Sequence, residues 1–249
     1  RRGERWELQL KGSGKTPYSW NGDGKAVLHP SVWEFLCSEA MHYLGIPTSR
    51  AASDNDVWGD QFYNGNIKKK EVMDTFQNNF RIGSLEILAH SGELDIKKRL
   101  LGFIIQEHFP SVAPSDSDRY LEFFSSVVSE TANLIALWMS VGFAHGVCNT
   151  GNFSLLSITT NYGPFGFMDS YDPNFVPNMS DDEGRYKIGN QANVGLFNLN
   201  KLLQAVKPLL DPRQKQLFTE LFKTKLGLLG DCEDDNYLIA FLLKVSLFC

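Results

Sequence analysis

The sequence has few cysteines, no long apolar run and no excess of positive charge, and each of these features excludes a class of protein. Its four cysteines include no CxxC pair, which excludes a disulfide scaffold and indicates reduced thiols of an intracellular protein. No apolar stretch approaches the roughly 18 to 20 residues that cross a bilayer, so we expect no contact with a membrane. The net charge of -5 provides no basic field for nucleic acid, and we expect no nucleic-acid partner.

What remains is the composition of a globular protein. Hydrophobic residues make up 43% of the 249 positions and charged residues 21%, which suits one large domain or two small ones with a sizeable core. The chain starts abruptly at Arg1 and stops at Cys249, directly after the apolar stretch 238–247. From these ends we expect a fragment.

The pattern of apolar residues predicts a small mixed part followed by a larger helical part. Residues 6–10 alternate as in a strand, a loop composition follows at 11–25, and residues 31–44 have the period of a helix. Residues 51–87 are mixed and polar, consistent with strands and loops. After residue 93 helical periodicity dominates, and helices are predicted at 118–143, 196–210, 214–229 and 236–248.

We therefore predict an α+β fold with a strand-and-helix lobe over residues 1–88 and a helical lobe over residues 89–249. Residues 145–172 interrupt the helical lobe with Gly, Asn, Thr and aromatic residues that show no helical period. A long irregular stretch inside a helical region is more often a functional site than a linker. We expect chemistry in this segment.

The loop after the first strand resembles a phosphate-binding P-loop only in part. Residues 12–16 read GSGKT, but the glycine expected five residues before Gly14 is Gln9. The glycine-rich continuation after Pro17 does not open a helix either. We reject the P-loop on both grounds.

A lysine and a glutamate form the second candidate phosphate site. Lys11 lies at the end of the first strand and Glu34 on the following helix, which is how protein kinases orient a lysine on nucleotide phosphates. Glu34 borders the buried face of its helix, whereas Glu39 points to solvent. Spacing alone favours another role, a capping box in which Glu34 bonds back to Ser31.

The irregular segment contains a third candidate site. Residues 145–152 read HGVCNTGN, and Asn161-Tyr-Gly163 begins nine residues after Asn152. This resembles the spacing of a kinase catalytic loop and its metal-binding Asp-x-Gly. Two alternatives stay open: the Asn and Gly residues serve left-handed turns, or His145 and Cys148 bind a metal, for which a lone HxxC is a weak signal.

Several longer segments together resemble the selenoprotein O family, in the order of that family and over nearly the whole chain. They are residues 6–19 (WELQLKGSGKTPYS), 34–41 (EFLCSEAM), 44–48 (LGIPT), 141–147 (VGFAHGV), 162–167 (YGPFGF) and 169–173 (DSYDP). The resemblance implies a two-lobed protein-kinase-like fold, with a partial N-lobe here. It also implies a protein adenylyltransferase activity, in which ATP binds in a flipped orientation and AMP is moved to Ser, Thr or Tyr hydroxyls.

The resemblance implies roles for four residues. Lys11 matches the phosphate-binding lysine of the family, and Glu34 matches its helix partner, which favours the ion pair over the capping box. Arg81 matches one of two arginines that hold the nucleotide phosphates. Asn152 matches the metal-liganding asparagine.

Three positions depart from the family pattern. Gly151 replaces the aspartate that serves as base, Asn161 replaces the metal-binding aspartate, and Asp74 replaces the other phosphate-binding arginine. Because glycine has no side chain that could take a proton, no catalytic base is intact here. A positioned base contributes typically about 10²- to 10⁴-fold in rate, so we expect a severe loss. Asn161 is a neutral amide where Mg²⁺ favours a carboxylate, and Asp74 would repel phosphates.

We expect, from the resemblance, a truncated and degenerate member of this family. It would use ATP and Mg²⁺, act on protein hydroxyls and have low or no activity. The alternatives are a catalytically dead pseudoenzyme that binds nucleotide or acts as a scaffold, and a structural fragment that binds no nucleotide. The family also implies an intracellular location, in mitochondria if the source is a eukaryote.

Overall fold

A computed structural model describes residues 7–11, 14–15, 28–55, 71–76, 80–112, 118–210 and 213 of the chain. The chain divides into two compact units, one of residues 1–79 and 159–163, the other of residues 80–158 and 164–249. The lobe boundary predicted at residue 88 falls inside helix α2 (Ile82–His90), which packs against other helices of the second unit. The assignment of the units to two kinase-like lobes stays a prediction.

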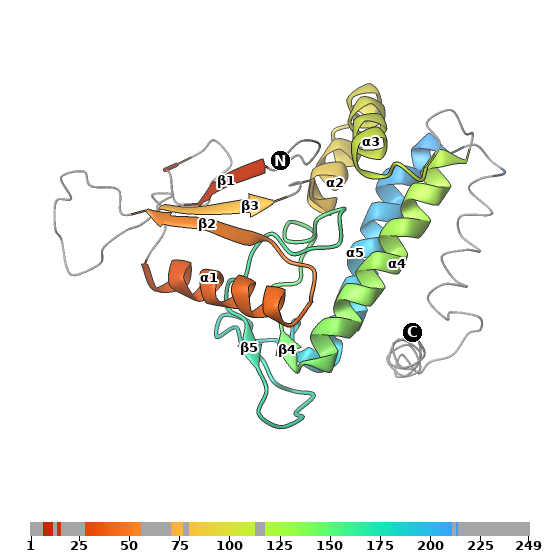
Figure 1. Cartoon of the computed structure of the whole chain (residues 1–249). Coiled ribbons are helices and arrows are strands. Elements are labelled where there is room, and N and C mark those ends of the chain that lie inside the picture. Colours follow the sequence, from red (N-terminus) through yellow and green to blue (C-terminus); the bar gives the residue numbers. More distant parts are fainter. Residues whose placement is uncertain are drawn as a thin grey trace. The chain divides into compact units, whose positions relative to one another are not determined.

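The first unit contains a three-stranded antiparallel sheet. Strand β3 (Glu71–Phe76) lies between β1 (Glu7–Lys11) and β2 (Arg50–Asn55) (Figure 1). In the register of β1 and β3, Lys11 stands opposite Val72 and Gln9 stands opposite Asp74. The strand predicted at residues 6–10 is confirmed with a shift of one residue, which makes Lys11 the last residue of β1.

Helix α1 (Leu28–Tyr43) packs against β2 of this sheet (Figure 1). It ends in a Schellman motif, because Gly45 adopts a φ of +74° that a glycine reaches without strain. Gly45 N donates to His42 O at 3.0 Å and Ile46 N donates to Met41 O at 2.9 Å. These bonds satisfy carbonyls at the helix end and fix the turn that leads into β2.

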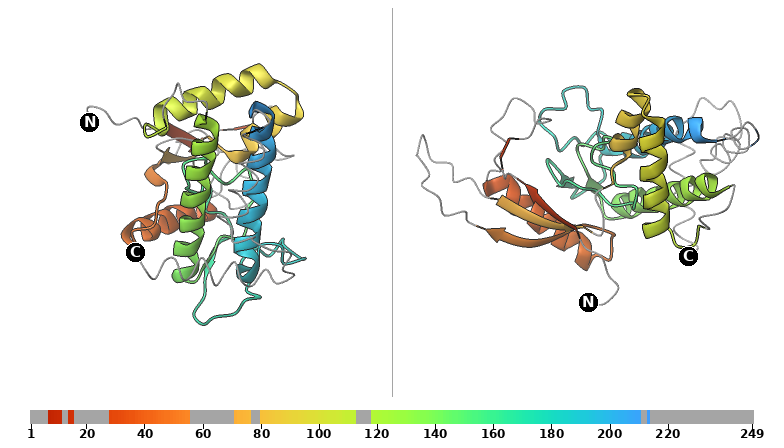
Figure 2. Two further views of the ribbon diagram at one scale, coloured as in Figure 1. Left: turned by 90° about the vertical axis from the view of Figure 1, so that its right-hand side faces the viewer. Right: turned by 90° about the horizontal axis from the view of Figure 1, so that it is seen from above.

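The described part of the second unit is mainly helical. It contains α2, α3 (Leu94–His108), α4 (Arg119–Ser140) and α5 (Gln191–Val206), with 3₁₀ turns at Ile188–Asn190 and Lys207–Leu209 flanking α5. Helices α4 and α5 run side by side (Figure 2). Their close approach depends on Gly195 of α5, since a side chain there would overlap Ile135 of α4.

An aromatic cluster joins α4 to the irregular segment. Trp138 is fully buried, and its ring lies 5.5 Å from that of Phe143 and 5.7 Å from that of Phe153. Phe143 belongs to β4 (Phe143–Ala144), which pairs with β5 (Gly166–Phe167). Residues 145–158, which contain no helix, are therefore anchored at this point on the core of the second unit.

The predicted helices that fall in the described ranges are confirmed. The helices predicted at 31–44, 118–143 and 196–210 correspond to α1, α4 and α5, with ends that differ by up to five residues. The sequence pattern does not predict α2, because its first turn contains glycine and serine, and packing against α3 and α5 decides its conformation. The predicted loop 11–25 and helices 214–229 and 236–248 lie largely or wholly outside the described residues.

The described helices were also compared with the length and hydropathy of a membrane span. None of the helices within these ranges combines the length and the apolar character that a bilayer span requires.

Candidate functional site

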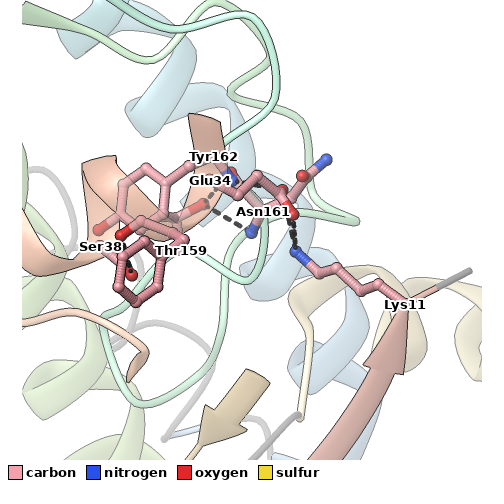
Figure 3. Close-up of polar contacts among 7 residues, drawn as sticks. Lys11, Glu34, Ser38, Thr159, Asn161 and Tyr162 are labelled. Atoms are coloured by element: carbon pink, nitrogen blue, oxygen red, sulfur yellow. Dashed lines mark hydrogen bonds and ion pairs between the residues drawn. The ribbon is translucent and has the colours of Figure 1, made fainter. Parts of the chain in front are cut away.

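An ion pair between β1 and α1 is the centre of the polar network in the first unit (Figure 3). Lys11 Nζ donates to Glu34 Oε1 at 2.9 Å and to Oε2 at 2.8 Å, and the two side chains are 19% and 11% exposed. The expected ion pair is therefore present. Ser31 lies in the first turn of α1, which begins at Leu28, so it is not the N-cap residue that the capping box requires.

The same glutamate also holds the segment that contains Asn161. Tyr162 N donates to Glu34 Oε1 at 3.0 Å, so one carboxylate connects Lys11 to the peptide bond between Asn161 and Tyr162 (Figure 3). Thr159 Oγ1 donates to Asn161 O at 3.1 Å. These contacts bring Lys11, Glu34 and Asn161 together in the first unit.

Tyr162 anchors this segment from its other side. Its ring is 2% exposed, and its hydroxyl lies 2.6 Å from Thr48 Oγ1. Burial raises the pKa of Tyr162, so the phenol stays protonated at neutral pH. The half-buried Asn161 is therefore held in place by a neighbour, Tyr162, that stays neutral at physiological pH.

Glu39 does not point to solvent as the helical wheel predicted. Arg50 Nε donates to Glu39 Oε1 at 2.8 Å and Arg50 Nη2 donates to Glu39 Oε2 at 2.9 Å. The hydrogen bond to Glu39 raises the pKa of Arg50. The prediction fails because the long Arg50 side chain on the next strand reaches back to α1.

In the second unit, the amide of Gln191 fixes the start of the 145–152 loop. Gln191 is 1% exposed; its Oε1 accepts from His145 N at 2.9 Å and its Nε2 donates to Phe143 O at 2.9 Å. The side chain therefore replaces a backbone peptide as partner for the segment that leaves β4. Further along α5, Asn198 Nδ2 donates to Cys148 O at 2.7 Å.

Asn152 and Gly151 lie at the end of this loop. Asn152 Nδ2 donates to Val147 O at 2.8 Å, which orients the amide and directs its Oδ1 away from that carbonyl. Gly151 has no side chain to accept a proton. A Cβ placed on it would lie 3.2 Å from Asn149 Oδ1, and its φ is not in the left-handed region, so the backbone accepts an L residue.

Arg81 is held beside the same loop. It forms an isolated β-bridge with Ser154, and the next two amides bond to the loop, Ile82 N to Phe153 O and Gly83 N to Thr150 O, both at 2.9 Å. Partial burial lowers the pKa of Arg81, although a guanidinium remains protonated at neutral pH. Arg81, Gly151 and Asn152 are thus gathered in the second unit.

A pocket of about 820 Å³ opens where α2 meets this loop. This volume lies in the range of small-molecule sites. Residues of α2 and its N-cap form most of the lining, and the loop contributes the rest: Arg81, Gly83, Ser84, Glu86, Ile87, His90, Ser91, Thr150 and Gly151.

The donor atoms for a metal ion are sparse. Within the described ranges, no three His, Cys, Asp or Glu side chains gather as a metal site would require. His145 Nδ1 accepts from Val147 N at 3.2 Å, and burial raises the pKa of Cys148, so the HxxC alternative has no support there. Asn152 and Asn161 offer amide oxygens only, which fits Mg²⁺ poorly without a carboxylate.

The register of the sheet places Asp74, which the sequence had already singled out, opposite Gln9. Two residues that hold the loop were not identified from the sequence. Gln191 and Glu86 were missed because their partners in the 143–150 segment lie 43 to 64 residues away along the chain. No local pattern marks such contacts.

Comparisons with known proteins identify relatives for most of the chain. The family model described as protein adenylyltransferase SelO matches residues 1–228. A protein nucleotidyltransferase YdiU of Xanthomonas campestris pv. campestris (strain B100) is 42% identical over 255 residues, covering 94% of this chain and 49% of the relative. The YdiU of Azoarcus sp. (strain BH72) is 46% identical over 214 residues, covering 83% of this chain and 41% of the relative.

A human protein is also similar. The mitochondrial protein adenylyltransferase SelO of Homo sapiens is 41% identical over 278 residues, covering 97% of this chain and 42% of the relative. The chain thus spans about half the length of the curated relatives it matches.

Proposed function

The chain belongs to the SelO family of protein adenylyltransferases, and from this we propose that it is a nucleotidyltransferase that moves AMP from ATP to Ser, Thr or Tyr hydroxyls of proteins. One observation carries the proposal. Lys11 is bonded to both oxygens of Glu34, and Glu34 also holds the backbone at Tyr162. A lysine fixed in this way is a rigid donor for nucleotide phosphates.

The fold that goes with this proposal is protein-kinase-like. A three-stranded antiparallel sheet with α1 beside it supports a small N-lobe, and the mainly helical second unit supports a C-lobe. The 145–152 segment then has the place of the catalytic loop. Its fixation by α5 supports a loop whose shape is kept between nucleotide-free and nucleotide-bound states.

In this proposal Lys11 and Arg81 neutralise charge on the triphosphate. A hydrogen bond between charged groups contributes about 1.5–3 kcal/mol, so each contact matters for affinity. Asn152 would contribute an amide oxygen, and Glu34 would act by positioning Lys11. Asp74 stands where the family has its other phosphate-binding arginine, and a carboxylate that faced the triphosphate would repel it.

We propose that transfer is impaired in this chain. Gly151 offers no proton acceptor, and the loss of a positioned base lowers the rate by about 10²- to 10⁴-fold. Asn161 offers a neutral amide in place of a carboxylate, so Mg²⁺ would bind weakly at Asn152 and Asn161. We assign no step to the metal, because the donors present do not fit it well.

The second candidate is a pseudoenzyme that binds nucleotide, or acts as a scaffold, without transfer. Gly151 and Asn161 favour it, because both substitutions remove chemistry while the Lys11–Glu34 pair remains. Either protein would act inside the cell, in mitochondria if the source is a eukaryote. The partners would be proteins with accessible hydroxyl side chains in the first case only.

Calorimetric titration of ATP, with and without Mg²⁺, tests the shared part of both candidates. We expect micromolar binding that depends only weakly on Mg²⁺, and Asn161→Asp should increase that dependence. Absence of ATP binding in both conditions would overturn the enzyme and the nucleotide-binding pseudoenzyme alike. AMP transfer then separates the two.

A further inference from the structure

A carboxylate contacts the residue directly before Gly151. Thr150 Oγ1 donates to Glu86 Oε2 at 2.9 Å, and Lys201 Nζ lies 3.3 Å from Glu86 Oε1. The two contacts occupy different oxygens, so the orientation of the carboxylate is fixed. Glu86 is still 23% exposed, and among the described residues that line the α2 pocket it is the only carboxylate.

The distance along α2 decides whether Glu86 or His90 lies close enough to Gly151 to accept a proton there. Gly83 packs on the loop, since a Cβ there would lie 3.4 Å from Gly151 Cα. At a rise of about 1.5 Å per residue, Glu86 lies about 4.5 Å beyond Gly83 along the helix axis, whereas His90 lies about 10 Å beyond it. His90 also uses Nδ1 to donate to Glu86 O at 2.9 Å. Glu86 is therefore the group within reach of the loop.

We propose that the α2 pocket receives the acceptor hydroxyl and that Thr150 and Glu86 together take its proton. This inference rests on the proposed AMP transfer. It gives the chain a proton acceptor despite Gly151, through a hydroxyl that already donates to a carboxylate. The acceptor would be a Ser, Thr or Tyr side chain, because the proton relay needs an O–H group that can donate to Thr150 Oγ1.

The reaction balances without another reactant. The acceptor oxygen bonds to the α-phosphorus of ATP while the bond from that phosphorus to the pyrophosphate oxygen breaks, and pyrophosphate leaves with the electron pair. The acceptor proton passes to Thr150 Oγ1, and Thr150 passes its own proton to Glu86 Oε2. Glu86 then releases the proton to solvent.

A purely structural role of Glu86 makes a different prediction. Glu86 links α2 to the loop and to α5, and a glutamine at this position would still accept the hydrogen bond from Thr150. Glu86→Gln therefore preserves the link and removes the proton acceptor. Thr150→Ser keeps the hydroxyl, and Thr150→Val removes it at nearly the same volume.

The test measures pyrophosphate release and self-transfer of AMP from ATP by the whole chain. Glu86→Gln and Thr150→Val should each lower kcat by about 10²-fold, with the Kd for ATP unchanged, while Thr150→Ser stays within about threefold of the wild type. Glu122→Gln on the exposed face of α4 is the matched control and should change nothing. In a Gly151→Asp background, the loss caused by Glu86→Gln should shrink to about threefold or less.

Each other outcome overturns the inference. It falls if Glu86→Gln behaves like Glu122→Gln, or if the wild type is inactive while Gly151→Asp with Asn161→Asp is active; in the latter case the proposed function stands. If neither protein releases pyrophosphate and ATP does not bind, the proposed function falls together with the inference. Unfolding curves identify a variant that is inactive only because it is unfolded. If Glu86→Gln is such a variant, the inference is tested by the kcat of Thr150→Ser compared with that of Thr150→Val.

Discussion

Removal of the Lys11 charge tests the proposed nucleotide site most sharply, because the first unit contains a matched ion pair. Lys11–Glu34 and Arg50–Glu39 both join α1 to a strand of the sheet, and both have closest N···O distances of 2.8 Å. Lys11→Met and Arg50→Met each remove one cation and retain apolar side-chain atoms. Only the first substitution should affect ATP.

The expected sizes follow from exposure. The side chains of Lys11 and Glu34 are 19% and 11% exposed, so the pair is neither fully exposed nor fully buried. An exposed ion pair contributes about 0–1 kcal/mol to stability, and breaking a buried one costs about 3–5 kcal/mol. We expect Lys11→Met to lower the free energy of unfolding by about 1–3 kcal/mol. Arg50→Met breaks a more exposed pair, and we expect about 1 kcal/mol or less.

Binding should separate the two variants further. A charge-assisted hydrogen bond to phosphate contributes about 1.5–3 kcal/mol, so Lys11→Met should raise the Kd for ATP by about 10- to 150-fold. Arg50→Met should leave the Kd unchanged. Calorimetric titration with ATP and urea unfolding measure both quantities on the same samples. Equal effects of the two variants on the Kd, or no effect of Lys11→Met, would refute the role given to Lys11.

Three further predictions concern the loop and the buried thiols. Gly151→Asp should fold, because the nearest atom to its Cβ is Asn149 Oδ1 at 3.2 Å, the end of a side chain that can shift. It should raise AMP transfer by up to about 10²-fold in a radiolabel assay, which is the part of the effect of a positioned base that Thr150 and Glu86 do not already supply. Gln191→Leu leaves two backbone groups of the 143–145 segment without their partner, and urea unfolding should show a loss of about 2 kcal/mol or more. Burial raises the pKa values of Cys37 and Cys148, so the unfolded state loses their protons first as pH rises; stability should therefore fall above about pH 8.5, and alkylation followed by mass spectrometry should find both thiols protected below it.

The sequence predicts the features that local chemistry determines. The end of α1 at Gly45 follows from residue type and spacing, whereas for Glu34 spacing alone favoured the capping box over the pairing with Lys11. A lysine at the end of a strand and a glutamate on the next helix match the protein-kinase pattern, which predicts that the two side chains form an ion pair. Family resemblance then decided between this ion pair and the capping box.

Contacts between distant segments could not be predicted. The bond from Tyr162 N to Glu34 spans 128 residues, and the contact between Arg50 and Glu39 depends on the turn after α1. Helix α2 forms because α3 and α5 cover it, although glycine and serine in its first turn disfavour a helix. Glu86 acquires its place beside the loop only through that helix.

The central claim is that a nucleotidyltransferase site persists in this chain and is limited by Gly151 and Asn161. The most direct test is AMP transfer from ATP labelled on the α-phosphate, compared between the wild type and the Gly151→Asp, Asn161→Asp double variant, with γ-labelled ATP as control. We predict label in protein only from the α-phosphate, and a rate in the double variant at least about 10²-fold above the wild type. Equal rates in the two proteins, or label transferred from the γ-phosphate, would contradict this claim.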